Sequence, residues 1–163
     1  MIHYSGNVSI QLNVNREIHE VVVMPQDTLL RVMREKIGYT GPKAGCENGD
    51  CGACTVLMDG KPVKACLMLA VEAVGKEVLT VEGLEDTEIQ KAFISEGGFQ
   101  CGFCTAGFLM NAFALLETNP DADEAEKKDW LSANLCRCTG YEGIEKALTL
   151  AQKRIQEKNN NKR

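Results

Sequence analysis

Eight cysteines are the residues of this sequence best suited to chemistry. In a reducing cytosol this number argues for metal ligation or redox chemistry rather than for four structural disulfides. Several of the thiols could also serve as small buried hydrophobic residues, which the count alone does not distinguish. The spacing does distinguish them, because ligands of one centre recur at short fixed intervals. Four cysteines lie in each half of the chain.

The first four cysteines follow the order C-x4-C-x2-C with a fourth at a distance; they are Cys46, Cys51, Cys54 and Cys66. This is the spacing of plant-type [2Fe-2S] sites. Interleaved glycines let the backbone bend tightly around a compact core; they are Gly45, Gly49 and Gly52. A structural zinc is the alternative for four thiolates, but its ligands usually come as two short pairs. We therefore predict a [2Fe-2S] cluster at this loop.

The second four cysteines form two short pairs, Cys101 with Cys104 and Cys136 with Cys138. Both pairs are expected beside helix N-termini, where the positive end of the helix dipole favours a thiolate. Taken alone, they could ligate zinc, and the C-x2-C pair could be a thioredoxin-like redox pair. No βαβ pattern surrounds that pair, and the neighbouring ferredoxin-type loop marks an electron carrier. A second [2Fe-2S] cluster is therefore the favoured interpretation, with zinc as the alternative.

The first half of the chain is expected to hold mixed α and β structure. Apolar and polar residues alternate from residue 8 onward, which is typical of a half-buried strand. Asp27 or Thr28 can cap a helix that ends near Gly38. The expected elements are strands over residues 8–14 and 19–24, a helix over 29–37, strands over 55–58 and 63–67, and an extended run over 78–81. Sheet and helix together would hold the first cysteine loop.

The second half is expected to be a small helical bundle. Thr87 and Gln90 match a capping box at the start of its first helix. Apolar residues then continue over 108–117 and predict a second helix. Asp121 or Asp123 can cap a short third helix. An apolar stripe over residues 141–155 predicts the last helix.

The change of pattern predicts where the domains meet. We place the boundary at 82–85, which gives a mixed α and β domain with the plant-type cysteine loop over 1–82 and a helical domain over 83–156. Residues 157–163 are rich in Asn and Lys and have nothing to bury, so an unstructured tail is expected there.

Composition excludes several classes of function. The net charge is −5, from 18 basic and 23 acidic residues with no basic run, so nucleic acid is not an expected partner. No apolar stretch approaches the roughly 18 residues of a membrane span, and the first residues lack the features of a signal peptide, which predicts a cytoplasmic protein. No G-x-G-x-x-G opens a helix, and no Ser–His–Asp or Cys–His set can be assembled. We expect no catalytic residue and no flavin or nicotinamide site in this chain.

Three motifs in order carry a resemblance to a known family. They are Gly45-Cys46-Glu47-Asn48-Gly49-Asp50-Cys51-Gly52-Ala53-Cys54-Thr55, then Gln100-Cys101-Gly102-Phe103-Cys104, then Asn134-Leu135-Cys136-Arg137-Cys138-Thr139-Gly140-Tyr141. Over nearly its whole length the chain resembles the small iron–sulfur subunit of molybdenum hydroxylases, the xanthine dehydrogenase family. Members include aldehyde oxidoreductases, carbon monoxide dehydrogenases, nicotinate dehydrogenase and hydroxybenzoyl-CoA reductase. The resemblance implies an α+β fold, in which a β-grasp plant-type ferredoxin-like domain precedes a four-helix domain and each holds one [2Fe-2S] cluster.

The resemblance also implies a role and partners. Such a subunit relays single electrons from molybdopterin on a large catalytic subunit, through its two clusters, to FAD on a medium subunit. Gln100 and Cys138 match the positions that contact the molybdopterin in relatives, and the first cluster would face the flavin. The expected assembly is a heterotrimer that dimerises and acts on a purine or another N-heterocycle.

One departure from the family pattern affects the second cysteine set. The family usually has Pro where this chain has Ala106, and because Ala suits a first helical turn, the ligation is expected to survive. The main alternative function is a free-standing two-cluster carrier of the ferredoxin type. The same subunit could also serve an enzyme for aldehydes, carbon monoxide or hydroxybenzoyl-CoA. A zinc-stabilised interaction module is the third option.

Overall fold

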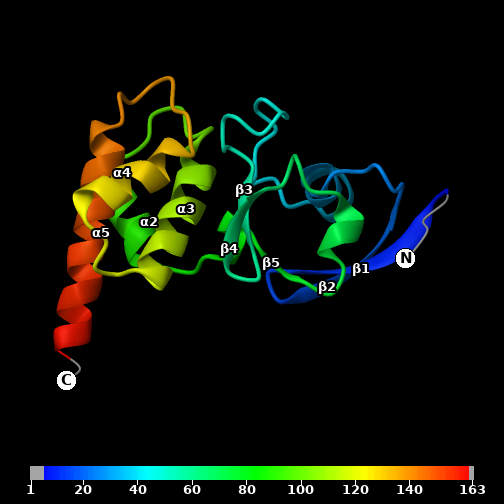
Figure 1. The fold of residues 1–163 in the computed structure, drawn as a ribbon, viewed down its shortest axis with the longest axis horizontal. Coiled ribbons are helices and arrows are strands. Elements are labelled where there is room, and N and C mark those ends of the chain that lie inside the picture. Colours follow the sequence, from blue (N-terminus) through cyan, green and yellow to red (C-terminus); the bar gives the residue numbers. More distant parts are fainter. Residues whose placement is uncertain (1–5, 162–163) are drawn as a thin grey trace.

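The computed structural model describes residues 6–161 as two lobes arranged along one long axis (Figure 1). A five-stranded sheet with a short helix forms one lobe, and four helices form the other. This confirms the predicted α+β class. The strands are β1 (Val8–Val14), β2 (Glu17–Val23), β3 (Thr55–Met58), β4 (Lys61–Lys64) and β5 (Glu77–Leu79). The helices are α1 (Leu29–Val32), α2 (Glu88–Ser95), α3 (Thr105–Thr118), α4 (Glu124–Ser132) and α5 (Glu142–Asn160).

The sheet has the strand order β2-β1-β5-β3-β4. β1 pairs antiparallel with β2 and parallel with β5, while β3 pairs antiparallel with both β4 and β5. Both hairpins turn over two residues with positive φ, Asn15 and Arg16 in the first and Asp59 and Gly60 in the second. Such two-residue turns match the twist of the flanking strands and therefore keep the hairpins short.

These tight turns correct two predicted strand boundaries. β2 begins at Glu17 rather than at residue 19, and β4 covers 61–64 rather than 63–67. Pro62 lies within β4 opposite Leu57, which an edge strand tolerates because one of its sides pairs with no other strand. The extended run predicted over 78–81 is mostly β5, and the 3-10 turn η3 (Val81–Gly83) follows it.

A hydrophobic core lies between the sheet and the helix that covers it. α1 begins where predicted, because the Thr28 hydroxyl accepts the N–H of Arg31 at 3.2 Å. The helix continues as the wider π-helical turn η1 (Met33–Ile37) and ends at Gly38, whose φ is 101°. A single regular helix was predicted over 29–37, whereas the second half of this segment is a more loosely wound π-helical turn. The core side chains include Leu12, Val14, Val23, Leu29, Val32, Met33 and Val56.

The helical lobe follows the predicted order of helices. The capping box of Thr87 and Gln90 is confirmed, and Asp123 caps α4 by accepting the N–H of Glu126 at 2.8 Å. α3 begins at Thr105, three residues before the predicted start, so that the second cysteine set directly adjoins it. The core of this lobe includes Phe93, Phe108, Met110, Leu115, Ile144 and Leu148.

The last helix is longer than predicted. An unstructured tail was expected from residue 157, whereas α5 extends to Asn160. The end of α5 lies against the start of α2, where Glu88 faces Arg154 and Lys158. This ion pairing gives the end of the helix a partner that its composition does not reveal. Within the expected domains and tail, residues 1–5 and 162–163 lie outside the described residues.

The two lobes meet where α3 packs against β3. Leu57 of β3 belongs to the hydrophobic cluster of the helical lobe, so the sheet contributes directly to the core of its neighbour. Among residues 6–161 no helix is both long and apolar enough to cross a membrane.

Candidate metal centres

The first cysteine set lies in the loop between η1 and β3, together with one cysteine that follows β4. Cys46 is exposed, and its sulfur accepts the backbone N–H of Cys51 at 3.3 Å. This bond and the N–H groups of Asn48 and Asp50 lower the pKa of the Cys46 thiol to about 7. The loop backbone is therefore arranged to favour a thiolate at its exposed end.

The other two sulfurs of this set form a buried pair. Burial raises the pKa of the Cys54 thiol to about 12, and the thiol of Cys66 lies within hydrogen-bonding reach of it. The backbone also joins these segments, because Ala65 donates to the Cys54 carbonyl at 3.4 Å. A buried thiolate needs a nearby positive charge, and an iron centre supplies one.

Glycine serves this loop in two different ways. Gly49 and Gly52 adopt φ of 91° and 71°, which confirms their predicted role in the tight bend. Gly45 is needed for space instead, because a Cβ there would lie 2.8 Å from the Cys51 sulfur and 3.5 Å from the ring of Phe103. The ring of Phe103, which belongs to the second cysteine motif, thus lies close to the first cysteine loop.

The second cysteine set also forms two pairs of sulfurs. The sulfurs of Cys101 and Cys138 are 3.7 Å apart and exposed. Cys104 and Cys136 are partly buried, and burial raises the pKa of the Cys104 thiol to about 12. Burial acts in the same direction on Cys136, but hydrogen bonds from the side chain and backbone of Thr139, the backbone of Cys138 and the Cys104 thiol together lower the pKa of that thiol. Cys104 is the N-cap residue of α3, as expected, whereas Cys136 and Cys138 lie a few residues before α5.

The arrangement of the eight sulfurs tests which metal centre fits. All eight cysteines are free, and each set divides into two close pairs. A binuclear [2Fe-2S] core takes two thiolates on each iron, so two close pairs of sulfurs in each set suit such a core.

A buried hydroxyl next to the second cysteine set in the chain is also compatible with a bound iron–sulfur core. The Thr105 hydroxyl is buried without a hydrogen-bond partner among the described residues, and Thr105 directly follows Cys104. An unpaired buried hydroxyl costs free energy unless a group absent from the chain accepts its hydrogen. An iron–sulfur core offers such acceptors, so this site also fits the group.

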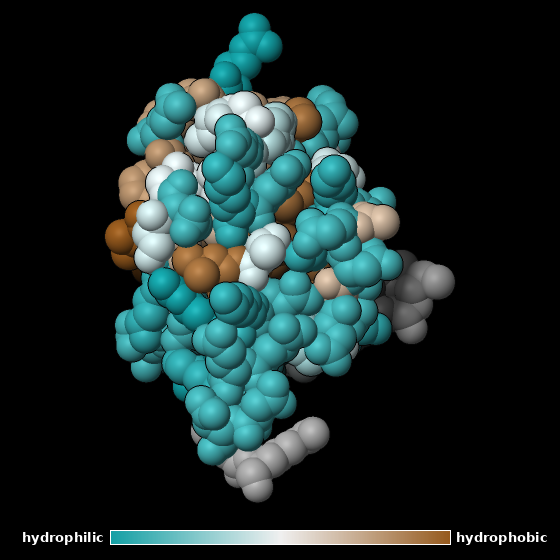
Figure 2. Space-filling view, turned by 90° about the vertical axis from the view of Figure 1, so that its left-hand side faces the viewer, coloured by the Kyte–Doolittle hydropathy of each residue, from teal (hydrophilic) through white to brown (hydrophobic). Residues whose placement is uncertain are grey.

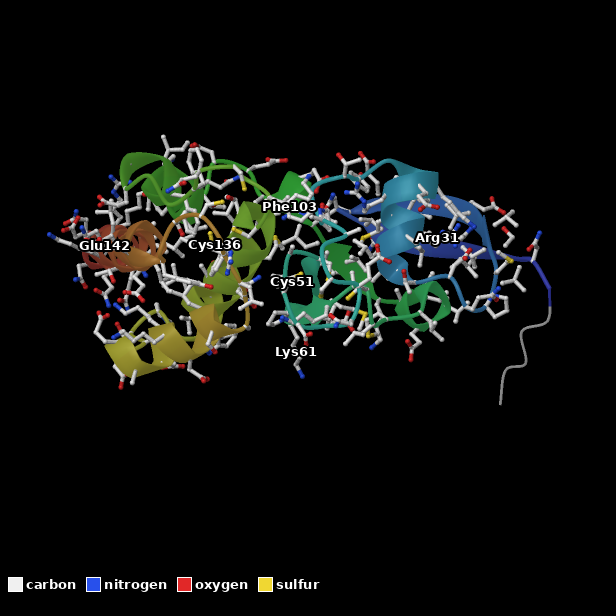
Figure 3. All side chains as sticks on the ribbon, turned by 90° about the horizontal axis from the view of Figure 1, so that it is seen from above. Arg31, Cys51, Lys61, Phe103, Cys136 and Glu142 are labelled. Atoms are coloured by element: carbon white, nitrogen blue, oxygen red, sulfur yellow. The ribbon has the colours of Figure 1, made fainter. Side chains whose placement is uncertain are left out.

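The two cysteine sets are joined through a polar junction between the lobes. The N–H of Leu135 donates to the carbonyl of Cys51 at 2.9 Å, and the side-chain amide of Asn134 donates to the carbonyl of Gly52 at 2.8 Å. Asn134 also accepts a hydrogen bond from the buried amide of Asn111. Figure 3 shows Cys136 and Cys51 between Glu142 at the helical end and Arg31 over the sheet.

The sequence alone does not predict this junction. Asn134 lies in the third cysteine motif with no role of its own there, and Asn111 lies within the mostly apolar stretch 108–117. One feature of the sequence does point to the junction. Asn111 is a polar residue at a position where the helical period predicts burial, and it lies on the buried face of α3.

The two residues expected to contact molybdopterin lie on the surface. Gln100 is exposed and adjoins Cys101, and Cys138 is exposed beside the same cysteine. The structure thus brings Cys138 and Cys101 together and leaves Gln100 exposed next to Cys101 in the chain. Ala106, which replaces the usual Pro, is buried in the first turn of α3, and the helix forms there without it.

Comparisons with known proteins agree with this geometry. Residues 10–98 match the family model described as a 2Fe-2S iron-sulfur cluster binding domain, and residues 80–149 match the model described as a [2Fe-2S] binding domain. These matches confirm the ferredoxin-like sheet domain followed by a helical [2Fe-2S]-binding domain.

Similar proteins cover almost the whole chain. The nicotine 6-hydroxylase small subunit of Paenarthrobacter nicotinovorans is 47% identical, over 95% of this chain and 96% of its own. The nicotinate dehydrogenase small FeS subunit of Eubacterium barkeri is 44% identical, over 91% and 98%. The crystal structure of quinoline 2-oxidoreductase from Pseudomonas putida 86 contains a chain with a TM-score of 0.88 and 41% identity, over 94% of this chain and 98% of that one.

The family models together span most of the sequence, and these relatives match it nearly end to end. The paired sulfurs, the two-lobed fold and the motifs around Cys46, Cys101 and Cys136 point the same way. The chain therefore belongs to the small [2Fe-2S] subunits of the molybdenum hydroxylases, the family of xanthine dehydrogenases, aldehyde oxidoreductases and nicotinate dehydrogenases.

Proposed function

We propose that this chain carries single electrons between the catalytic and flavin subunits of a molybdenum hydroxylase. In this proposal each cysteine set holds one [2Fe-2S] cluster, the first through Cys46, Cys51, Cys54 and Cys66 and the second through Cys101, Cys104, Cys136 and Cys138. The observation that carries the proposal is that both cysteine sets reach the surface and are also joined inside the protein. Each set contains at least one exposed cysteine, and a backbone hydrogen bond connects the two sets. When bound, the clusters supply one-electron redox chemistry.

The chain contributes a short connection between the two sites. The path begins at the surface with the exposed sulfurs of Cys101 and Cys138 and continues inward to the partly buried Cys104 and Cys136. The segment preceding Cys136 is hydrogen-bonded to Cys51, and the exposed Cys46 lies beyond it. Along this path electrons can enter at the surface near Cys101 and leave at the surface near Cys46, and the chain needs no substrate site of its own.

Exposed apolar side chains near the second cysteine set favour the binding of another protein subunit at this surface. Phe99, Phe103 and Leu135 expose 42%, 47% and 54% of their surface, and each lies within two residues of a cysteine of this set in the chain. Figure 2 shows that hydrophilic residues cover most of the outer end of the helical lobe and that hydrophobic residues gather in its upper half. Large apolar side chains left exposed near a redox site are more typical of an interaction surface than of a free carrier. We assign the large molybdopterin subunit to this surface, with Gln100 and Cys138 facing the molybdopterin.

The remaining partners are assigned from the other end of this path. The medium FAD subunit is assigned to the exposed loop around Cys46, and the three chains form a heterotrimer that dimerises. The substrate class proposed for the complex is an N-heterocycle, with purines included. Its support is that similar proteins are named for nicotine, nicotinate and quinoline.

The test is iron and acid-labile sulfide analysis of anaerobically purified protein, with electron paramagnetic resonance of the reduced sample. We expect about four irons and four sulfides per chain and two distinguishable S = 1/2 signals. Copurification with a molybdenum-containing and a flavin-containing chain supports the complex, whereas a stable monomer supports the free carrier. A colourless protein that contains zinc and cannot be reconstituted would refute the electron-transfer role.

The role of Gln100 is tested separately. Gln100→Ala should leave both clusters intact, because the residue is exposed and ligates no iron. Contact with the molybdopterin subunit should weaken, and turnover of the assembled complex should fall. Unchanged turnover with both clusters present would reject the assignment.

A further inference from the structure

Thr139 makes an unusual set of contacts beside the second cysteine set. Its hydroxyl lies 3.1 Å from the sulfur of Cys136, and its backbone N–H donates to the same sulfur at 3.5 Å. Two donors of one residue thus converge on a single thiol. Thr139 lies between Cys138 and the start of α5, in a segment whose shape is set by the positive φ of Gly140 and Tyr141.

The direction of the hydroxyl hydrogen follows from a third contact. The N–H of Tyr141 donates to the Thr139 oxygen at 3.2 Å, so this oxygen already accepts one hydrogen bond. A hydroxyl has one hydrogen to donate, and the sulfur of Cys136 is the acceptor within reach. The O–H of Thr139 therefore points at the sulfur.

The same segment is held from its other side. The phenol oxygen of Tyr141 accepts the N–H of Cys136 at 3.0 Å, and its ring packs edge to face on Phe108 in the core of the helical lobe. Cys136, Thr139 and Tyr141 thus form a closed set of hydrogen bonds. Thr139 keeps its orientation because both of its neighbours in this set are fixed.

We propose that the Thr139 hydroxyl raises the reduction potential of the [2Fe-2S] cluster held by the second cysteine set. The inference rests on the proposed ligation by Cys136. A ligand sulfur carries more negative charge when the cluster is reduced, so a donor aimed at that sulfur stabilises the reduced form more than the oxidised form. Thr139 is a positioning residue in this account, since it acts through Cys136 and contacts no substrate.

The effect matters because Cys136 adjoins the junction to the first set. Leu135, the residue before it, is hydrogen-bonded to Cys51. A higher potential at the second cluster favours electron entry from the molybdenum side and makes transfer to the first cluster less downhill. Thr139 would thus set how electrons divide between the two clusters.

The experiment is a redox titration with dithionite, followed by electron paramagnetic resonance, of the purified holoprotein and of Thr139→Val and Thr139→Ser. Val keeps the branched shape and removes the hydroxyl, while Ser keeps the hydroxyl. At the wild-type midpoint we expect the oxidised-to-reduced ratio of the second cluster to rise about threefold or more in Thr139→Val. That corresponds to a downward shift of about 28 mV at roughly 59 mV per tenfold for one electron. Thr139→Ser should retain the wild-type potential.

Two internal controls keep a structural effect apart from an effect on the potential. The signal of the first cluster should titrate unchanged in every variant. Thr118→Val, which removes a hydroxyl bonded only to the backbone of α3, should move neither potential. Resonance Raman spectra in H2O and D2O add a second readout, because the Fe–S stretching bands of the second cluster should lose part of their isotope shift in Thr139→Val.

The outcomes separate this inference from the proposed function. A second cluster that is present in Thr139→Val with an unshifted potential would overturn the inference while leaving the ligation intact. If Thr139→Val does not load the cluster, Thr139→Ala, which adds no methyl beside the sulfur, takes its place with the same expected shift. Loss of the cluster in both variants but not in Thr139→Ser would also overturn it, because the hydroxyl would then serve assembly. Wild-type protein that lacks a second cluster would instead refute the proposed function.

Discussion

The carbonyl oxygen of Cys51 accepts the backbone N–H of Leu135 at 2.9 Å, which joins the loop of one cysteine set to the segment that enters the other. These residues lie in different lobes, so the contact exists only because α3 packs against β3. A backbone hydrogen bond places no demand on the side chain of either residue, which leaves Cys51 free to ligate and Leu135 free to face a partner.

Each cysteine set is expected to hold its cluster independently. Cys51→Ser should remove only the signal of the first cluster, and Cys104→Ser only that of the second, because no residue belongs to both sets. Iron analysis should fall to about half in either variant, with one paramagnetic signal left. The loss of both signals from a single substitution would contradict two separate sites.

Asn134→Ala should loosen the junction between the lobes. The side chain is buried, donates to the Gly52 carbonyl and accepts from Asn111, so its removal leaves a buried amide unpaired. We expect the free energy of unfolding to fall by about 1–3 kcal/mol, measured by urea denaturation. Asn159→Ala, on the exposed end of α5, is the control and should change it little. Equal stability of both variants would show that the junction contributes nothing.

Gly107→Ala tests how closely the lobes approach. Ala is ordinarily the better helix former, but a Cβ at residue 107 would lie 2.2 Å from the Gly52 carbonyl oxygen and 2.5 Å from the Asn134 amide. The clash should outweigh the gain in helix propensity and destabilise the protein by about 1–3 kcal/mol. Gly60→Ala, at a positive φ with open space around it, separates backbone strain from the clash. A stabilised Gly107→Ala protein would disprove the close approach.

Asp27 should make stability depend on acid pH. Its buried carboxylate accepts hydrogen bonds from Lys36 at 2.8 Å and from the N–H of Met24 at 3.0 Å, and these lower its pKa below the ordinary value. The unfolded chain then binds the proton more tightly than the folded protein. The contribution is therefore fully present above the unfolded value near roughly pH 4 and is lost as pH falls through the folded pKa.

Urea denaturation of wild type and Asp27→Asn at several pH values checks this. The wild type should be more stable by about 1–3 kcal/mol near neutral pH, and the difference should shrink as the pH is lowered below about 4. Comparing the two proteins at each pH cancels any shared loss of clusters in acid. A difference that stays constant over this range would contradict a titrating role for Asp27.

The sequence by itself determined the local features of this protein. The spacing of the first four cysteines indicated the plant-type loop, and the capping residues Thr28, Thr87 and Asp123 marked the starts of helices that the structure confirms. These features depend on hydrogen bonds and periodicities among near neighbours, which is why a linear sequence displays them. Bounds that depend on pairing between segments were less accurate: β2 begins at Glu17 and β4 at Lys61, because the two-residue hairpin turns leave these residues to pair with Val14 and Met58. α5 likewise continues to Asn160, past the expected start of the tail at residue 157.

The tertiary structure decided how the eight sulfurs pair and how the two sets connect. Asn134 and Gly52 are separated by 82 residues in the chain, yet a hydrogen bond joins them because α3 brings the helical lobe onto β3. Spacing alone does not say which sulfurs of the second set lie next to each other. Packing between distant segments fixes that geometry, and the hydroxyl of Thr139 acquires its sulfur partner only within it.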